Sequence, residues 1–260
     1  MFALRDCLIT HERVVALWRE VMAASAHLPD ASALRGTVRL VGDRGAFVLE
    51  GGHAWPGAEA FLAALPSFDY AWWQPYVGRR RRIGAVEGHA PPFASFSQVN
   101  PDVAAALWSF VEERVMAHEP SHVVDAYAGT GRLAVALHMR GIRTSAVERD
   151  EDAVAWAASR IGKPSRAIAA ATEDALGDCL PADVVVLNPP RAGVDARVTA
   201  LLERTTPAPR AIIYVSCDPA TLARDLARLP SWTIANVTAF DMFPQTAHVE
   251  TVVELTRSAT

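Results

Sequence analysis

The sequence predicts an α/β protein in which a Rossmann-like, doubly wound domain over residues 91–260 follows a small α+β domain over residues 1–90. From residue 99 onward, apolar strands alternate with helical segments, and such repeated β–α units form a parallel sheet that helices cover on both faces. Before residue 90, helix and strand patterns are mixed. Residues 84–92, rich in glycine, proline and histidine, separate the two patterns and mark the domain boundary.

The first domain shows three local patterns. They are a helix at residues 11–27, a hairpin at residues 36–41 and 45–50, and a short helix at residues 56–65. Four consecutive arginines, residues 79–82, follow them. This run is either a basic surface that contacts RNA or a solvated loop without a partner.

The second domain begins with a helix over residues 101–118, and Pro101 suits its first turn because no helical N–H is lost there. Five apolar strands follow, at residues 123–127, 144–147, 166–169, 184–187 and 211–215. Helices alternate with them, at residues 133–140, 152–161, 195–204 and 219–229. Two final strands, at residues 233–240 and 248–255, predict an antiparallel member at one edge of the sheet.

Composition limits the class of protein. No apolar run approaches the roughly 20 residues that span a bilayer, and residues 1–7 lack the pattern of a signal peptide, so we expect no membrane segment. The three cysteines are far apart and odd in number, which argues against a disulfide scaffold and is typical of a reducing cytosol. We therefore expect a cytoplasmic protein. Its formal net charge of −4 provides no overall attraction to nucleic acid.

The first strand of the second domain runs into a glycine turn, D-A-Y-A-G-T-G, over residues 125–131. Gly129 and Gly131 let the backbone approach a ligand closely because they carry no Cβ. Glu148 ends the second strand, 17 residues after Gly131, near the spacing at which a carboxylate binds ribose hydroxyls. The third glycine of dinucleotide-binding turns is absent, so the pattern favours S-adenosylmethionine as the cofactor. Tyr127 packs either against that cofactor or in the core.

Cys217 follows an apolar strand and directly precedes a helix that begins at Pro219. A thiol there lies at the carboxyl end of the sheet and close to a helix N-terminus, which stabilises an anion and lowers the thiol pKa. The position therefore predicts a nucleophile. The alternative is a small buried hydrophobic residue, which is the more frequent role of an isolated cysteine.

Three sequence blocks lie at strand ends on one side of the predicted sheet, and a fourth precedes its first helix. They are S-C-D-P-A-T-L-A-R-D-L from Ser216, F-P-Q-T-A-H-V-E ending at Glu250, N-P-P-R from Asn188, and F-S-Q-V-N-P, which contains Gln98. Over residues 93–257, this set resembles the RNA 5-methyluridine (uracil-C5) methyltransferase family. The resemblance implies a class I S-adenosylmethionine-dependent enzyme that methylates uracil C5 in tRNA or rRNA.

The resemblance also implies roles for individual residues. Cys217 is the nucleophile that adds covalently to uracil C6, and Glu250 is the base that removes the C5 proton. The alternative interpretation, from the strand pattern alone, is that Glu250 is a solvent-facing residue of a strand in which apolar and polar residues alternate. The positions that match cofactor-binding residues of the family, two of them close to the target base, are Gln98, Tyr127, Glu148 and Asn188.

The chain departs from the family at several points, and two of them bear on its chemistry and on how it holds RNA. Asn188 stands where the family usually has aspartate, so it can donate to O4 of uracil and accept from N3–H but supplies no negative charge. Family members also commonly carry an N-terminal RNA-binding barrel and an iron–sulfur cluster on four cysteines. With three cysteines, we expect no iron–sulfur cluster and no metal site. RNA is then held by residues 1–90, including the arginine run, or by a partner.

Two other functions stay open. Asn-Pro-Pro followed by an aromatic residue is typical of methylation at an amino group, but Arg191 follows here, and that chemistry has no use for Cys217 and Glu250. The other is a relative that binds RNA or cofactor without catalysis. The missing barrel favours this second alternative, and the two intact motifs argue against it.

Overall fold

The computed structural model describes residue 7 and residues 10–41, 43–84, 100–242, 244–246 and 248–257. The chain forms two compact units, Met1–Phe93 and Ala94–Thr260. The boundary that the sequence predicts at residue 90 falls within residues 85–99, outside the described part of the chain. No helix in the described ranges is long and apolar enough to cross a membrane.

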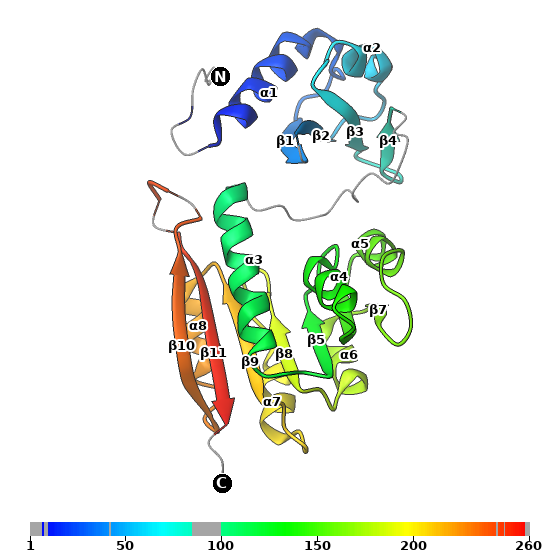
Figure 1. The fold of residues 1–260 in the computed structure, drawn as a ribbon. Helices are drawn as coiled ribbons and strands as arrows, with labels where there is room; N and C mark the ends of the chain where they lie inside the picture. Colours follow the sequence, from blue (N-terminus) through cyan, green and yellow to red (C-terminus); the bar gives the residue numbers. More distant parts are fainter. Residues whose placement is uncertain are drawn as a thin grey trace. The chain divides into compact units, whose positions relative to one another are not determined.

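The N-terminal unit is a four-stranded sheet with helices (Figure 1). Its elements are α1 (Glu12–Ala23), a 3-10 turn η1 (Ser25–His27), β1 (Arg35–Val41), β2 (Arg44–Glu50), α2 (Ala58–Ala63), β3 (Phe68–Gln74) and β4 (Arg81–Ile83). The predicted hairpin is confirmed as the antiparallel pair β1–β2, and both predicted helices are present. Phe47, Phe61 and Trp55 form the centre of the core, together with Leu17 and Val21 of α1.

The sequence did not predict β3 and β4. Residues of β3 are buried on both faces, so the strand lacks the alternation of apolar and polar residues that reveals a half-buried strand. β4 has only three residues, and two of them are arginines. Arg81 and Arg82 therefore lie in a strand rather than in a loop, paired with Trp73 and Trp72 of β3. The Arg81 guanidinium lies 5.6 Å from the centre of the Trp73 ring.

The second unit contains a seven-stranded sheet in the order β10-β11-β9-β8-β5-β6-β7. The strands are β5 (His122–Ala126), β6 (Arg143–Glu148), β7 (Arg166–Ala169), β8 (Val184–Leu187), β9 (Ala211–Ser216), β10 (Trp232–Phe240) and β11 (Glu250–Arg257). The five strands from β5 to β9 are parallel. The predicted antiparallel member is confirmed as β11, which lies between β9 and the edge strand β10.

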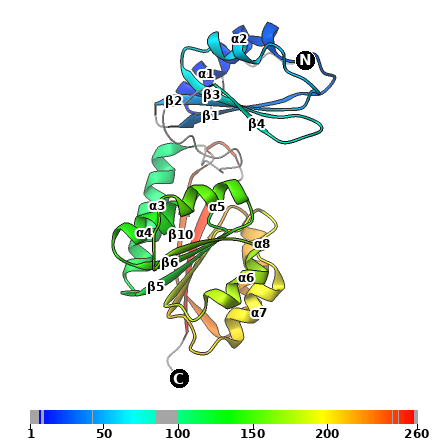
Figure 2. The ribbon, with the colours of Figure 1, turned by 90° about the vertical axis from the view of Figure 1, so that its right-hand side faces the viewer.

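Helices cover both faces of this sheet, as the sequence predicts (Figure 2). On one face lie α3 (Pro101–Met116), α4 (Arg132–Met139) and α5 (Glu151–Ala158), and on the other lie α6 (Thr172–Cys179), α7 (Ala196–Arg204) and α8 (Pro219–Leu226). The sequence did not predict α6, since its eight residues include Gly177 and three acidic side chains. A separate apolar core lies on each face of the sheet, and both consist mainly of aliphatic side chains.

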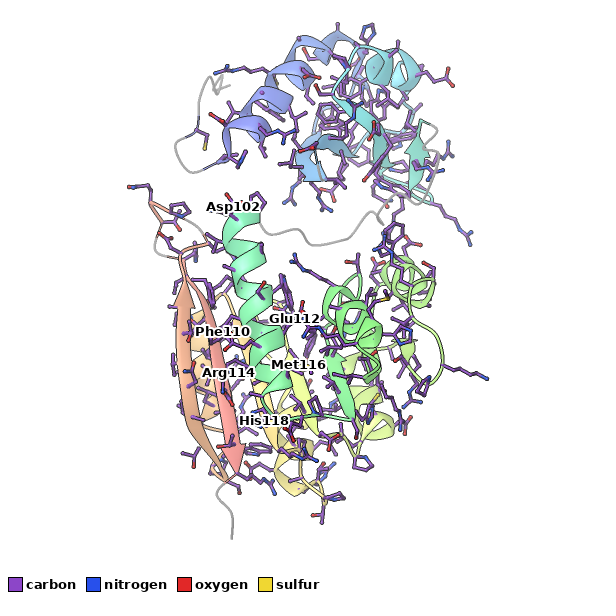
Figure 3. The ribbon with its side chains drawn as sticks, viewed as in Figure 1. Asp102, Phe110, Glu112, Arg114, Met116 and His118 are labelled. Carbon is purple, nitrogen blue, oxygen red and sulfur yellow. The ribbon has the colours of Figure 1, made fainter. Side chains whose placement is uncertain are left out.

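A buried carboxylate ties α3 to β11. Glu254 is 3% exposed. One of its carboxylate oxygens accepts a hydrogen bond from Arg114 Nε at 2.7 Å, and the other pairs with His118 Nε2 at 2.7 Å. Figure 3 shows Arg114 and His118 near the end of α3, beside β11. Burial opposes the charge of Glu254, but the hydrogen bonds from Arg114 and His118 outweigh burial and hold the pKa of Glu254 below its usual value.

We expect Glu254→Gln to lower the free energy of unfolding by about 3 kcal/mol at pH 7, because the change leaves a partly buried guanidinium without its counter-ion. A carboxylate whose pKa is lower in the folded state stabilises the fold at pH values above its pKa in the unfolded chain, which is about 4.3. This stabilisation is lost as the pH falls through the pKa of the folded state. Urea denaturation at several pH values measures both effects. Glu112→Gln, which weakens the partly exposed pair of Glu112 with Arg140, is the control and should change stability by less than about 1 kcal/mol.

Candidate active site

The predicted site residues of the described chain gather at one edge of the seven-stranded sheet. Tyr127, Asn188 and Cys217 directly follow β5, β8 and β9, and Glu148 is the last residue of β6. Because β11 runs antiparallel, it begins at this same edge, with Glu250 as its first residue (Figure 1). The carboxyl ends of parallel strands are where open α/β sheets bind ligands.

The pairing of β11 with β9 brings Glu250 to Cys217. Thr251 pairs with Ser216, so Glu250 and Cys217 occupy the next opposite positions, where side chains of an antiparallel pair point to the same face. Glu250 is 2% exposed, and Cys217 is half-buried. The alternative of a solvent-facing Glu250 is therefore wrong.

The environment of the Cys217 thiol differs from the sequence-based expectation. Burial raises its pKa, and the nearby Glu250 carboxylate raises it further. The neighbouring helix N-terminus does not reverse this shift, because the Asp218 carboxylate caps α8 and accepts hydrogen bonds from the N–H groups of Ala220 and Thr221, both at 2.9 Å. The negative charge that a helix terminus favours is thus already supplied by Asp218.

Arg191 is a site residue to which the sequence assigned no role. Its guanidinium lies close to the Cys217 thiol, and its charge lowers the pKa of that thiol, partly offsetting burial and Glu250. Its charge also lowers the pKa of Asp218. The signal was present in the N-P-P-R block, where the arginine replaces the aromatic residue of amino methyltransferases.

Asn188 lies at the same edge of the sheet, half-buried, and its backbone N–H donates to the carbonyl of Ala126 at 3.2 Å. This bond continues the pairing of β8 with β5 by one residue beyond the strands. Asn188 therefore lies where the two central strands, β5 and β8, end. Its contact with cofactor or base stays a prediction.

The glycine turn holds the Glu148 carboxylate in a fixed orientation. One oxygen of Glu148 accepts from the N–H of Gly129 at 2.9 Å, and the other accepts from those of Arg149 at 2.7 Å and Asp150 at 3.0 Å. Gly129 has φ +53°, and a Cβ added there would have no atom within 4 Å, so open space lies in front of the turn. Gly131 has φ +73°, and a Cβ there would lie 2.6 Å from the Ala157 Cβ. The turn accordingly requires glycine at 131 for packing and leaves room at 129.

Tyr127 has φ +60°, an uncommon conformation for a residue with a large side chain. Its pKa is raised to about 12, first by burial and then by the charge of Glu173. The Thr172 side chain and the Asp195 backbone oppose this shift, so the hydroxyl lies near the beginnings of α6 and α7. The structure thus shows Tyr127 packed against the protein core, and its predicted contact with a cofactor stays a prediction.

Gln98 lies outside the described residues, as do Phe243 and Ala247 of the block that ends at Glu250. The predicted role of Gln98 stays a prediction. Within the ranges that the structure describes, no three side chains of histidine, cysteine, aspartate or glutamate gather in the way that a metal ion requires.

Comparison with known proteins covers the part of the chain that carries most of these residues. Residues 173–258, which carry Asn188, Cys217 and Glu250, match the sequence model of the family described as tRNA (Uracil-5-)-methyltransferase. The 23S rRNA (uracil(747)-C(5))-methyltransferase RlmC of Vibrio vulnificus is 33% identical over 168 residues, 63% of this chain, and that of Cronobacter sakazakii is 34% identical over 168 residues. The predicted family resemblance is confirmed over the matched residues.

The chain spans 44% of the length of each of these curated relatives. A solved structure of similar fold is the tRNA (uracil-54, C5)-methyltransferase of Pyrococcus abyssi in complex with S-adenosyl-L-homocysteine. The similarity has a TM-score of 0.73 at 23% identity and covers 98% of this chain and 69% of that one. It confirms the predicted Rossmann-like fold.

A buried acid behind the glycine turn makes stability depend on pH. Asp125 is 2% exposed, and burial, with a smaller contribution from the charge of Glu148, raises its pKa to about 7. One of its carboxyl oxygens accepts a hydrogen bond from the N–H of Ala134 at 3.2 Å, which opposes the shift without reversing it. A raised acid pKa means that the folded state holds a proton that the unfolded chain has released.

We expect the free energy of unfolding to fall as pH rises from about 4 to about 7, by about 1.4 kcal/mol per pH unit from Asp125 alone. Asp125→Asn removes this contribution and keeps an oxygen for the Ala134 N–H. Thermal or urea denaturation of both proteins between pH 4.5 and 8 should therefore show the variant gaining stability relative to the parent as pH rises. Parallel pH profiles would contradict the assignment of a buried, protonated Asp125.

Proposed function

We propose that this protein methylates C5 of uracil in RNA, either tRNA or rRNA, with S-adenosylmethionine as the methyl donor and a covalent bond between Cys217 and uracil C6 as the intermediate. The observation that carries the proposal is the cross-strand placement of the buried Glu250 beside the Cys217 thiol, whose pKa the nearby Arg191 lowers. The relatives named for uracil-C5 methylation of 23S rRNA support the same reaction.

The reaction needs a nucleophile and a base on one face of the pyrimidine. Uracil C5 is a poor nucleophile, but addition of the Cys217 thiolate to C6 moves the electron pair of the C5–C6 double bond into an enolate and makes C5 nucleophilic. C5 then forms the bond to the methyl carbon while the bond between that carbon and the sulfonium sulfur breaks and leaves its electron pair on the sulfur. Glu250 removes the C5 proton, the C5–C6 double bond forms again, and the bond from C6 to the Cys217 sulfur breaks.

Arg191 serves the first step by favouring the thiolate. Glu250 must lie near the ring for the last step, and its charge makes the thiol harder to ionise. The Arg191 guanidinium is the nearby group that acts in the opposite sense. The placement of Arg191 near Cys217 also argues against methylation of an amino group, for which neither residue has a use.

The residues of the glycine turn fit an adenosyl cofactor. Glu148 is oriented by three backbone N–H groups, and the space in front of Gly129 is open. We infer that Glu148 binds the ribose hydroxyls and that Gly129 and Gly131 let the ligand approach the backbone, with Gln98, Tyr127 and Asn188 as further contacts. When bound, S-adenosylmethionine supplies a methyl group on a sulfonium, which needs no metal ion for transfer.

We further propose that the N-terminal unit contacts the RNA through the arginine run at residues 79–82. Arg79, Arg81 and Arg82 are exposed. Phosphate contacts by arginine supply most of the non-specific affinity of nucleic-acid-binding proteins, and a local basic surface provides them even in a chain of net charge −4. A base in structured RNA must also leave its stack to reach Cys217.

The covalent step is tested with RNA in which uridine is replaced by 5-fluorouridine. Fluorine at C5 blocks the removal that Glu250 performs, so the enzyme with S-adenosylmethionine should form an adduct that survives denaturation. We expect Cys217→Ala to form no adduct and Cys7→Ala to form it at the parental level. Glu250→Gln should accumulate an adduct on ordinary RNA, with a methylation rate at least about 100-fold lower.

Methylation of ordinary RNA without any adduct on the fluorinated substrate would rule out the covalent C5 mechanism. Failure to bind S-adenosylmethionine, measured by calorimetry on the same protein, would leave a non-catalytic relative as the better description.

The RNA contact is tested through its dependence on salt. Arg79→Gln with Arg82→Gln should weaken RNA binding and reduce the slope of log K against log salt by about 0.7 for each phosphate that is no longer neutralised. Arg140→Gln with Arg160→Gln removes the same charge from exposed arginines of the other unit and is the matched control. Equal changes in slope for both double variants would mean that overall charge, rather than the arginine run, determines the affinity.

A further inference from the structure

A buried carboxylate outside the reacting groups lies beneath the segment that carries Asn188 and Arg191. Asp225 of α8 is 0% exposed, and one of its oxygens accepts from the N–H of Val194 at 2.9 Å and from the hydroxyl of Tyr214 at 2.8 Å. The other oxygen faces two guanidinium groups, with distances of 2.8 Å to Arg224 Nη2 and 3.2 Å to Arg228 Nη1. Both oxygens of this buried acid thus accept from two donor groups each.

These hydrogen bonds join the two segments that meet at the site. Tyr214 belongs to β9, which ends next to Cys217, and Val194 ends the segment that follows β8 and contains Arg191. The Arg224 guanidinium also donates to the carbonyl of Ala192 at 2.8 Å. Asp225 and Arg224 of α8 therefore hold this segment at both a donor and an acceptor of its backbone.

The backbone of the segment can do little to restrain itself. Pro189 and Pro190 have no N–H to donate, and the N–H of Gly193 bonds within the segment, to the carbonyl of Pro190 at 2.8 Å. Gly193 has φ +77°, and a Cβ there would lie 2.3 Å from the Asp225 carboxylate. The close approach of backbone and carboxylate thus depends on glycine at this position.

We propose that Asp225 is a positioning residue that holds residues 188–194 in the conformation that places the Arg191 guanidinium beside the Cys217 thiol. Asp225 touches neither the Cys217 thiol nor the Glu250 carboxylate. It acts through its hydrogen bond with the Val194 N–H, and through Arg224, which it holds and which donates to the carbonyl of Ala192. The role in catalysis rests on the proposed function, but the placement of Arg191 beside Cys217 is a property of the protein alone. It can be measured without RNA or cofactor.

The test measures how fast iodoacetamide alkylates Cys217 as a function of pH, with the modified peptide followed by mass spectrometry. In Asp225→Asn, an amide N–H₂ must face either the Val194 N–H or the two guanidiniums, so a donor meets a donor. We expect the pH midpoint of alkylation to rise by about one unit, as for the removal of a nearby opposite charge. Arg191→Gln should give the same rise, and the double variant should rise no further than either single one.

Glu254→Gln is the matched control, because it removes the charge of an equally buried carboxylate that is held by an arginine but touches no part of residues 188–194. It should leave the midpoint of Cys217 alkylation unchanged. If Asp225→Asn does not fold, Tyr214→Phe removes one of the same donors without a change of charge, and Gly193→Ala forces the segment away from the carboxylate. Both should raise the midpoint in the same direction.

An unchanged midpoint in the Asp225 variant, while Arg191→Gln raises it, would overturn the proposal. Additive shifts in the double variant would overturn it as well. On RNA, Asp225→Asn should lower kcat about tenfold with a smaller change in KM, as expected for a misplaced reacting group rather than for weaker substrate binding. An inactive parent protein would count against the proposed function and would leave the alkylation result intact.

Discussion

The antiparallel insertion of β11 between β9 and β10 is the constraint on which the rest of the site depends. The other strands of the seven-stranded sheet bring their carboxyl ends to the reactive edge, where the residues that follow them lie in loops. Among these seven strands, β11 alone brings its amino end there. Glu250 can therefore be both the first residue of a paired strand and the neighbour of a residue that follows β9. A base held by backbone pairing is placed more precisely than one on a loop.

This placement has an electrostatic cost at the nucleophile. A carboxylate close enough to remove a proton from a ring bonded to Cys217 also raises the pKa of that thiol, in addition to burial. Arg191 offsets part of the shift, but it lies in a segment that contains two prolines and a left-handed glycine and has little secondary structure of its own. The support that such a segment lacks comes from α8, through Asp225 and Arg224.

Buried carboxylates link elements of this unit at several places, and their charge is stabilised in different ways. Glu254 and Asp225 face arginines, and they link α3 to β11 and α8 to the segment after β8. Asp125 instead accepts from a backbone N–H, and burial raises its pKa. A buried acid either is paired with a cation or shifts its pKa toward the neutral form.

Much of the second unit could be predicted from the sequence alone, because short apolar strands that alternate with helices allow few arrangements. The glycine turn with Glu148, and the blocks that carry Cys217 and Glu250, also depend on local spacing and were visible without a structure. The strands β3 and β4 and the helix α6 were not, since two-sided burial, short length and poor helix formers conceal them. Local pattern therefore determined the elements and the residues at their ends.

Only the tertiary structure decided what surrounds Cys217. Its raised pKa, its nearness to Arg191 and the buried position of Glu250 arise from segments that are distant in sequence and meet through the pairing of β9 with β8 and with β11. The helix start after Cys217 predicted an activated thiol, but burial and the Glu250 charge raise its pKa, and the Asp218 carboxylate already caps the helix. Electrostatic effects depend on distance in space and on burial, and neither is encoded in the spacing of residues along the chain.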